Sequence, residues 1–196
     1  MKELIGLVVC GGLSMRMGMD KSLIEWHGIE QRYYLYRMLE TLCKKVYISC
    51  NNSQSDQIAP GYSYIIDDDK YFNTGPIAAL LTAFGEFPGK SFLVVGCDYP
   101  FIVEKDLLQL VSNRNEDRNA ISFFNKRSGF YEPLLSIYEN KIAGSLFENF
   151  DKQQHSLQVI LVGSGAKKVT PSNLRSIQSI DTRHEYLNAI EELRIK

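Results

Sequence analysis

Four apolar runs rich in β-branched residues constrain the fold of this chain more than any other feature. They are LIGLVV (4–9), KVYISC (45–50), SFLVVGC (91–97) and NAISFF (119–124), and their spacing leaves room for a helix or a loop after each strand. Strands that are apolar throughout are typical of parallel sheets with both faces covered, because a sheet with one solvated face alternates apolar and polar residues. The sequence therefore predicts a three-layer α/β fold, with a mostly parallel central sheet and helices on both faces.

Helical patterns lie between and after these runs. Residues 29–43 repeat aromatic and apolar positions at helical spacing, and residues 76–84 begin with a proline after a glycine, which favours a helix start. The run YEPLLSIY (131–138) predicts one more strand, entered past a proline, which favours a sheet edge or a strand start. Further helices are expected over 104–112, 141–150 and 184–194.

Length, composition and charge indicate one globular domain spanning residues 1–196. Of the 196 residues, 44% are hydrophobic and 23% are charged, and no linker-like or low-complexity stretch interrupts the chain. The formal net charge of −1 provides no general basic field to attract nucleic acid or an anionic membrane. We therefore expect neither as a partner, and any anion must be bound by a few placed groups.

The amino-terminal run and the cysteines point to the cytoplasm. Residues 4–10 are far fewer than the roughly 20 that a membrane-spanning helix needs, and they carry no signal-peptide pattern. The four cysteines lack the paired short spacing of a zinc site, so we expect reduced and mostly buried thiols.

The segment CGGLSMRMGMDK (10–21), directly after the first strand, predicts an anion site. Two adjacent glycines allow a sharp turn that offers several backbone N–H groups to one anion. Arg16 and Lys21 add cationic side chains, which suits a triphosphate. The alternative is a tight turn with solvated cations.

Two common phosphate loops do not match this segment. A Walker loop requires glycine directly before Lys-Ser/Thr, whereas two residues separate Gly18 from Lys21. The dinucleotide pattern G-x-G-x-x-G also fails, because Gly11 and Gly12 are adjacent. The sequence therefore supports neither P-loop hydrolysis nor nicotinamide binding.

The longer stretch GGLSMRMGMDKSLIEWHG (11–28) resembles the signature of nucleotidyltransferases with a Rossmann-like sheet, and in detail that of the molybdenum cofactor guanylyltransferases, the MobA family. Later family motifs follow in order, and the resemblance spans residues 7 to about 190. These motifs are VYISCNN (46–52), IIDDDKYFNTGPIAALLTAF (65–84), LVVGCDYPFI (93–102), YEPLLSIY (131–138) and SIDTRHEYLNAI (179–190).

The resemblance implies a nucleotide site at the ends of the first strands. Asp68 would accept hydrogen bonds from the guanine edge, whereas Asp67 and Asp69 are expected in a solvated turn. Asn51 aligns with an asparagine near the nucleotide, although Asn52 could replace it and a turn asparagine is the alternative. The nucleotide-binding residues implied are Val9, Cys10, Gly11, Gly12, Lys21, Asn51, Asp68, Gly75 and Asp98.

The resemblance also implies a magnesium ion. Asp98 follows the strand 91–97, and the carboxyl end of a central parallel strand is where ligands of open α/β sheets bind. A carboxylate there suits Mg²⁺, although an aspartate before proline also forms turns. Asp181 stands where the family usually has asparagine, and it could be a second metal-facing carboxylate or a helix N-cap. We favour the cap with partial metal involvement.

The second substrate is implied on the carboxyl-terminal side, where Glu132 and Pro133 would face it. The stretch HSLQVIL (155–161) lacks the arginines that are common in the family. Phosphate contacts in this chain would then need other cations, and the candidates are Arg127, Lys152, Lys167 and Lys168.

The activity that the resemblance implies is transfer of GMP from GTP to the phosphate of molybdopterin or the molybdenum cofactor, with release of pyrophosphate. Arg16, Lys21 and Asp98 would be the catalytic residues, and other cofactor-biosynthesis proteins are potential partners. No protein nucleophile is needed, so Cys10 and Cys97 are expected to have packing roles rather than to act as catalytic thiols. The histidines are expected to be structural or exposed; they are His27, His155 and His184.

Three alternatives stay open. The chain could be a cytidylyltransferase for the same pterin, although Cys-Gly-Gly at the loop favours guanine over the Ala-Ala-Gly of cytidine-specific members. It could be another small-molecule or sugar-phosphate nucleotidyltransferase, although these are usually longer. It could also be a nucleotide-binding regulatory domain without catalysis.

Overall fold

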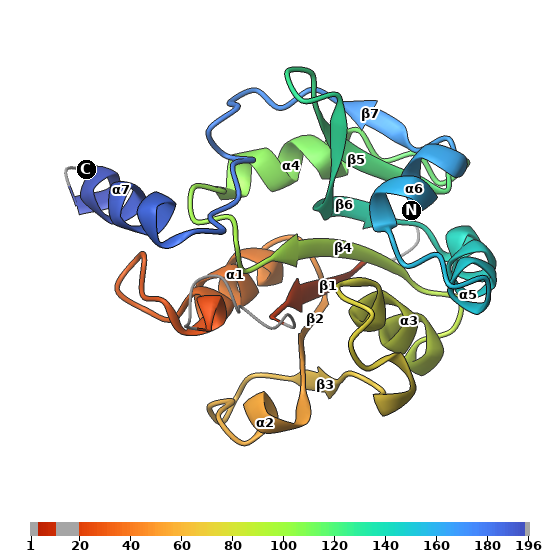
Figure 1. Ribbon diagram of the computed structural model, residues 1–196, viewed down its shortest axis with the longest axis horizontal. Coiled ribbons are helices and arrows are strands. Elements are labelled where there is room, and N and C mark those ends of the chain that lie inside the picture. Colours follow the sequence, from red (N-terminus) through yellow and green to blue (C-terminus); the bar gives the residue numbers. More distant parts are fainter. Residues whose placement is uncertain (1–3, 11–19, 195–196) are drawn as a thin grey trace.

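The computed structural model describes residues 4–10 and 20–194, and within these ranges it contains a seven-stranded sheet with the order β3-β2-β1-β4-β6-β5-β7 (Figure 1). The strands are β1 (Leu4–Val9), β2 (Lys45–Cys50), β3 (Tyr64–Ile66), β4 (Ser91–Gly96), β5 (Ala120–Asn125), β6 (Phe130–Tyr138) and β7 (Lys167–Val169).

Most strand pairs in the sheet are parallel. β1 is parallel to both β2 and β4, β2 is parallel to β3, and β5 is parallel to β7. β6 alone among the described strands runs antiparallel to its neighbours β4 and β5. The predicted mostly parallel sheet is confirmed, and the carboxyl ends of β1 to β4 meet at one edge.

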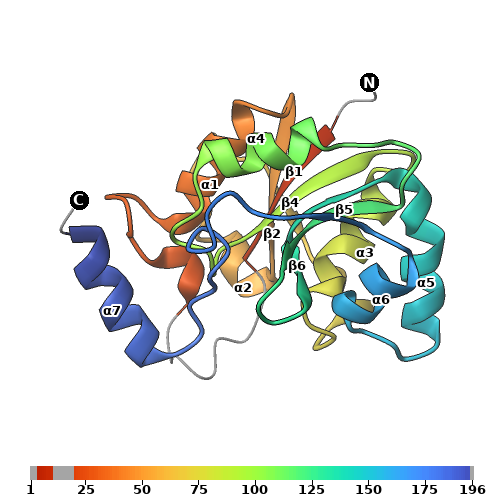
Figure 2. The same cartoon turned by 90° about the horizontal axis from the view of Figure 1, so that it is seen from above.

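Helices cover both faces of the sheet (Figure 2). α1 and α4 pack on one face, and α3, α5 and α6 pack on the other, while α7 lies outside these layers. The helices are α1 (Gln31–Glu40), α2 (Asn52–Ser55), α3 (Ile77–Glu86), α4 (Glu104–Ser112), α5 (Ala143–Asp151), α6 (Leu157–Gly163) and α7 (Arg183–Arg194), with short 3₁₀ helices η1 (Lys21–Leu23), η2 (Asp69–Tyr71) and η3 (Asn140–Ile142).

The first strand shows why the apolar runs are continuous. Leu4 and Val8 pack into the core beneath α1 and α4, whereas Ile5, Leu7 and Val9 pack into the core against α3. All five side chains are buried. Since both faces of β1 pack against helices, the residues that point to either face must be apolar.

The prediction that the strand with Pro133 lies at an edge or starts there is wrong. β6 lies between β4 and β5, and Pro133 is in its interior. The β5–β6 register shifts between Ser122 and Phe124, opposite this part of β6. An irregularity of this kind tolerates a proline because the residue has no ladder hydrogen bond to donate there.

Across the described residues, no helix has both the length and the apolar character that a membrane crossing requires.

Candidate functional site

The ends of β1 and β4 lie side by side at the carboxyl edge of the sheet. Cys97 N–H donates to the Val9 carbonyl at 3.2 Å, and Cys10 N–H donates to the Ser49 carbonyl of β2 at 3.0 Å. The Sγ atoms of Cys10 and Cys97 are 3.3 Å apart, and both thiols are free and buried in the core. Burial raises the pKa of Cys97 well above its usual value, so this thiol stays protonated. The expected packing role of both cysteines is confirmed.

Asp98 follows Cys97 and has a partly buried carboxylate at the carboxyl edge of the sheet. Its Oδ1 atom is buried and has no hydrogen-bond partner among the described residues. Burial raises the pKa of Asp98 to about 6, the charge of Lys21 opposes this rise, and the charge of Asp181 adds to it. These three charged groups therefore lie close enough to act on one another.

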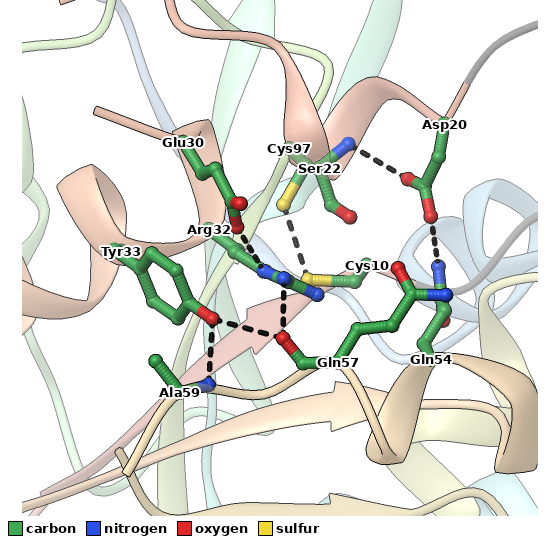
Figure 3. A network of polar contacts seen from close by, with 10 residues as sticks. All are labelled: Cys10, Asp20, Ser22, Glu30, Arg32, Tyr33, Gln54, Gln57, Ala59 and Cys97. Atoms are coloured by element: carbon green, nitrogen blue, oxygen red, sulfur yellow. Dashed lines mark hydrogen bonds and ion pairs between the residues drawn. The ribbon is translucent and has the colours of Figure 1, made fainter. Parts of the chain in front are cut away.

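Lys21 opens η1 and points to the carboxyl-terminal part of the chain. Its Nζ atom is 2.5 Å from Oδ1 of Asp181, and the Lys21 side chain is 19% exposed. Asp20 holds this turn, because its Oδ1 accepts from Ser22 N–H at 2.8 Å. Its Oδ2 accepts from the Gln54 side chain at 2.6 Å, which ties α2 to the residue before Lys21 (Figure 3).

The expectation that Asp181 caps a helix is wrong. Thr182 and Glu185 form the cap of α7: Glu185 N–H donates to Thr182 Oγ1, and Thr182 N–H donates to Glu185 Oε2. The Asp181 carboxylate instead receives Lys21 on one oxygen and the Ser179 hydroxyl, at 2.9 Å, on the other. α7 thus begins one residue later than a cap at Asp181 would require, and the Asp181 carboxylate faces Lys21 instead.

A divalent cation fits the chemistry of this group. Mg²⁺ is typically held by one or two carboxylates, with water and substrate phosphates completing its coordination. Asp98 offers a buried oxygen without a partner among the described residues, and a Cβ at Gly96 would lie 2.5 Å from that oxygen. Within residues 4–10 and 20–194, no three His, Cys, Asp or Glu side chains form a metal-binding cluster. Asp98, with Asp181 as a second candidate, could therefore hold an ion that the substrate brings.

Glu132 of β6 adjoins Asp98 through Tyr99. The buried Tyr99 hydroxyl donates to Glu132 Oε2 at 3.0 Å. Burial raises the pKa of Glu132 to about 7; the Tyr99 hydrogen bond opposes this rise, and the charge of Asp98 adds to it. The structure therefore brings Lys21, Asp98, Asp181 and Glu132 together, with Pro133 next in the chain.

Asn51 lies at the end of β2, where it caps α2. Its Oδ1 atom accepts from Gln54 N–H at 3.0 Å and from the Ser53 hydroxyl at 2.7 Å. Gln54 Oε1 in return accepts from Asn51 N–H at 3.0 Å. This is the turn role considered as the alternative for Asn51, and a contact with a nucleotide stays a prediction. Asn52 is the first residue of α2 and is exposed.

Asp68 is exposed and already engaged. Its Oδ1 accepts from Lys70 N–H at 3.0 Å and its Oδ2 pairs with Lys70 Nζ at 2.9 Å, which lowers the pKa of Asp68. Gly75 lies further along the same loop with a positive φ of 77°, just before α3, where a glycine avoids steric strain.

The neighbouring Asp67 does not lie in a solvated turn, so that prediction is wrong for this residue. It is partly buried, and its Oδ1 accepts from the Ser49 hydroxyl at 2.5 Å. Burial raises the pKa of Asp67 to about 6, and the Ser49 hydrogen bond opposes this rise. Asp69 is exposed, as expected.

The remaining cations differ in their surroundings. Lys152 pairs with Glu148, Lys167 donates to the Asn113 carbonyl at 2.8 Å, and Lys168 lies 4.0 Å above the Phe124 ring. Arg127 lines a cleft of about 340 Å³; the other lining residues are Asn125, Leu174, Arg175 and Gln178.

The three histidines fit the structural or exposed roles expected of them. His27 contacts the Pro100 carbonyl, His155 stacks on Phe150, and the exposed His184 contacts Asn188.

Gly11, Gly12 and Arg16 lie outside the described residues, and so does the part of the predicted anion site that they form. Asp20, Gln54 and Tyr99 are site residues that sequence reasoning missed. Asp20 had a readable signal, since an aspartate two residues before Ser22 N–H, at the start of a short helix, is a typical cap. Gln54 and Tyr99 act through contacts between distant segments, which no local pattern encodes.

Comparisons with known proteins identify the family of this chain. Residues 6–167 match the family model described as MobA-like NTP transferase domain. The chain is 32% identical over 93% of its length to a molybdenum cofactor biosynthesis bifunctional protein of Synechocystis, but it spans only 52% of that protein. It is 28% identical to a molybdenum cofactor guanylyltransferase of Pseudomonas aeruginosa, covering 83% of this chain and 82% of the relative.

A solved structure shares the fold. The molybdopterin-guanine dinucleotide biosynthesis protein A of Archaeoglobus fulgidus superposes with a TM-score of 0.81 at 20% identity, covering 98% of this chain and 100% of that protein.

Proposed function

Since the chain belongs to the MobA-like NTP transferase family, we propose that it transfers GMP from GTP to the terminal phosphate of molybdopterin or the molybdenum cofactor and releases pyrophosphate. The observation that carries this proposal is the grouping of Asp98, Lys21 and Asp181 at the carboxyl end of the central strands. Relatives named molybdenum cofactor guanylyltransferase support the choice of reaction.

The chemistry asks for positioning and charge neutralisation. A phosphate oxygen of the pterin attacks the α-phosphorus of GTP, the bond to the β-phosphate oxygen breaks, and pyrophosphate leaves with its electron pair. Lys21 supplies a cation near the leaving charge, with Arg16 and the amides of Gly11 and Gly12 as further donors in this proposal. No protein nucleophile is required, since the attacking phosphate is already ionised.

We propose Asp98 as the ligand of Mg²⁺, with Asp181 as a second carboxylate. When bound, the ion would neutralise charge on the phosphate oxygens during the transfer. Among the described residues, Oδ1 of Asp98 has no hydrogen-bond partner, and this supports the assignment because a buried carboxylate oxygen without a donor is stabilised by a cation.

Recognition of the base is proposed for the loop after β3 together with the end of β2. Asp68 would accept from the guanine edge once its carboxylate leaves Lys70, and Asn51 and Gly75 would line the same pocket with Val9 and Cys10. The names of the relatives favour guanine over cytosine.

The second substrate is proposed to lie against Glu132 and Pro133, with the cleft at Arg127 providing a cation for its phosphate. In this arrangement the amino-terminal part of one domain binds GTP and the carboxyl-terminal part binds the pterin. We place the reaction in the cytoplasm, where the four thiols would stay reduced.

The test is pyrophosphate release with molybdopterin and Mg²⁺, using GTP or CTP. We expect turnover with GTP and little with CTP. Preference for CTP would identify a cytidylyltransferase instead. Binding of GTP without any pyrophosphate release would favour a nucleotide-binding regulatory domain.

A further inference from the structure

The irregular part of β6 meets the end of β4 at two points. Leu134 lies against Gly96, and Glu132 accepts the hydrogen bond of Tyr99. Asp98 lies between Gly96 and Tyr99 in the sequence. The segment 96–99 therefore contacts β6 on either side of the carboxylate assigned to the metal.

We propose that Gly96 and Tyr99 are positioning residues that set two carboxylates of the active site: Gly96 leaves the space that the Asp98 carboxylate occupies, and the Tyr99 hydroxyl fixes Glu132 toward the second substrate. This inference rests on the proposed function, which assigns Asp98 to the metal and Glu132 to the pterin.

The case for Gly96 is steric. A Cβ at this position would lie 2.5 Å from Asp98 Oδ1, 2.9 Å from Leu134 Cδ1 and 3.0 Å from Leu134 Cβ. The first distance is well below contact distance, so one group has to move. The carboxylate is the freer of the two neighbours, because Leu134 Cβ is fixed to the strand backbone. Any side chain at position 96 would therefore turn the Asp98 carboxylate away from its present orientation.

The case for Tyr99 is its hydrogen bond to Glu132, a residue whose backbone is held in place by other contacts. The Glu132 carbonyl accepts from two serine hydroxyls, Ser122 at 3.1 Å and Ser136 at 2.8 Å, so the backbone of this residue is held in place. Its carboxylate then receives the Tyr99 hydroxyl at 3.0 Å. Tyr99 is buried, and its own carbonyl accepts from the Gln31 side chain at 3.2 Å. A donor held this firmly limits the rotamers open to Glu132.

The first test replaces Tyr99 by phenylalanine, which removes only the hydroxyl. We expect the KM for molybdopterin to rise about tenfold, because a hydrogen bond to a charged group is lost. The kcat, the KM for GTP and the affinity for Mn²⁺ should stay unchanged. Tyr131→Phe is the matched control, since it removes another buried hydroxyl, bonded to the Ala166 carbonyl at 2.8 Å, on the opposite face of β6.

The second test replaces Gly96 by alanine. We expect Mn²⁺ affinity, followed by electron paramagnetic resonance, to fall about tenfold or more, with a similar loss in kcat. The KM for molybdopterin should not change. Gly144→Ala is the control, because a Cβ at this helical position meets no atom within 4 Å.

A double variant separates positioning from folding. Gly96→Ala with Leu134→Ala removes the 2.9 Å contact with Leu134 Cδ1 but keeps the contact with the Cβ of residue 134 and the closer one with the carboxylate. We expect Mn²⁺ affinity to stay low even where the melting temperature recovers. Full recovery of Mn²⁺ affinity would overturn the role of Gly96, and an unchanged molybdopterin KM in Tyr99→Phe would overturn that of Tyr99.

The Mn²⁺ readout is independent of the proposed reaction. Mn²⁺ binding to the wild type and to Gly96→Ala tests the first half without turnover. A wild type that binds Mn²⁺ at Asp98 but releases no pyrophosphate would refute the proposed function alone.

Discussion

Asp98 and Asp68 are both acidic residues that follow parallel strands at the same edge of the sheet, yet their surroundings are opposite. Asp98 has a buried oxygen with no partner among the described residues, and burial raises its pKa to about 6. Asp68 is exposed, and Lys70 lowers its pKa. The same residue type thus forms a cation-seeking carboxylate in one place and a satisfied surface cap in the other.

The position of each strand in the sheet explains this difference. β4 lies between β1 and β6, so the chain leaving it is enclosed on both sides, whereas β3 is an edge strand and the chain leaving it faces solvent. A charged group that is shielded from water needs an opposite charge nearby. At Asp98 Lys21 supplies one, and the proposed metal ion would supply another.

The largest expected effect follows from replacing each aspartate by asparagine. Asp98→Asn should lower kcat for pyrophosphate release by about 10²–10³-fold, because charge stabilisation of the transferring phosphoryl group is lost. Asp68→Asn should leave kcat unchanged. Steady-state kinetics with saturating GTP, Mg²⁺ and molybdopterin measure both, and equal losses of kcat would remove the distinction between the two sites.

The two sites can also be compared through the lysine beside each aspartate, Lys21 near Asp98 and Lys70 near Asp68. Lys21→Gln should lower kcat about 100-fold, since this cation lies beside Asp98 and Asp181. Lys70→Gln is the matched substitution beside Asp68 and should not affect kcat. A kcat for Lys21→Gln close to that of the wild type would show that Lys21 does not touch the triphosphate.

The burial of Asp67 at the end of β3 can be tested by measuring the stability of the protein against pH. Its folded pKa of about 6 lies above its ordinary value of 3.8, so the folded state takes up a proton more readily. Stability should therefore fall as pH rises from about 4 to about 6 and stay low above that. Asp67→Asn should remove this fall and stabilise the protein at pH 7.5 by about 2 kcal/mol.

Denaturant unfolding over this pH range measures the effect, with Asp69→Asn as the exposed control. A stability profile of Asp67→Asn parallel to that of the wild type would mean that another group carries the pH dependence.

The smallest expected effect concerns the selectivity for GTP over CTP. Asp68→Asn should raise the KM for GTP about tenfold and leave the KM for CTP unchanged, since only guanine offers the N1 and N2 donors together. Competition between the two nucleotides in one assay measures the selectivity. If the variant keeps wild-type selectivity, guanine is read elsewhere in the site.

The regular part of the fold was predictable because both faces of its strands are buried. The continuous apolar character of β1, β2 and β4 located these strands from the sequence alone. β3 and β7 have three residues each, too few to show a period. α6 went unpredicted although Ser156 caps it, since its seven residues give a weak helical signal.

The site was predictable where a motif carries the residue. Lys21, Asp98 and Glu132 fall in such motifs, and the structure places them together. Asp67 shows the limit: β3 ends at Ile66, and strand alternation puts Asp67 on the same inward face as Ile65. A shift of one residue decides which aspartate is buried, and sequence patterns rarely locate a strand end that closely.

Mn²⁺ titration followed by electron paramagnetic resonance, in the presence of GTP, tests the central claim most directly. The wild type and Asp68→Asn should bind the ion with the same affinity, whereas Asp98→Asn should bind it at least about tenfold more weakly. Equal Mn²⁺ affinity in the wild type and in Asp98→Asn would contradict the assignment of Asp98 as the metal ligand.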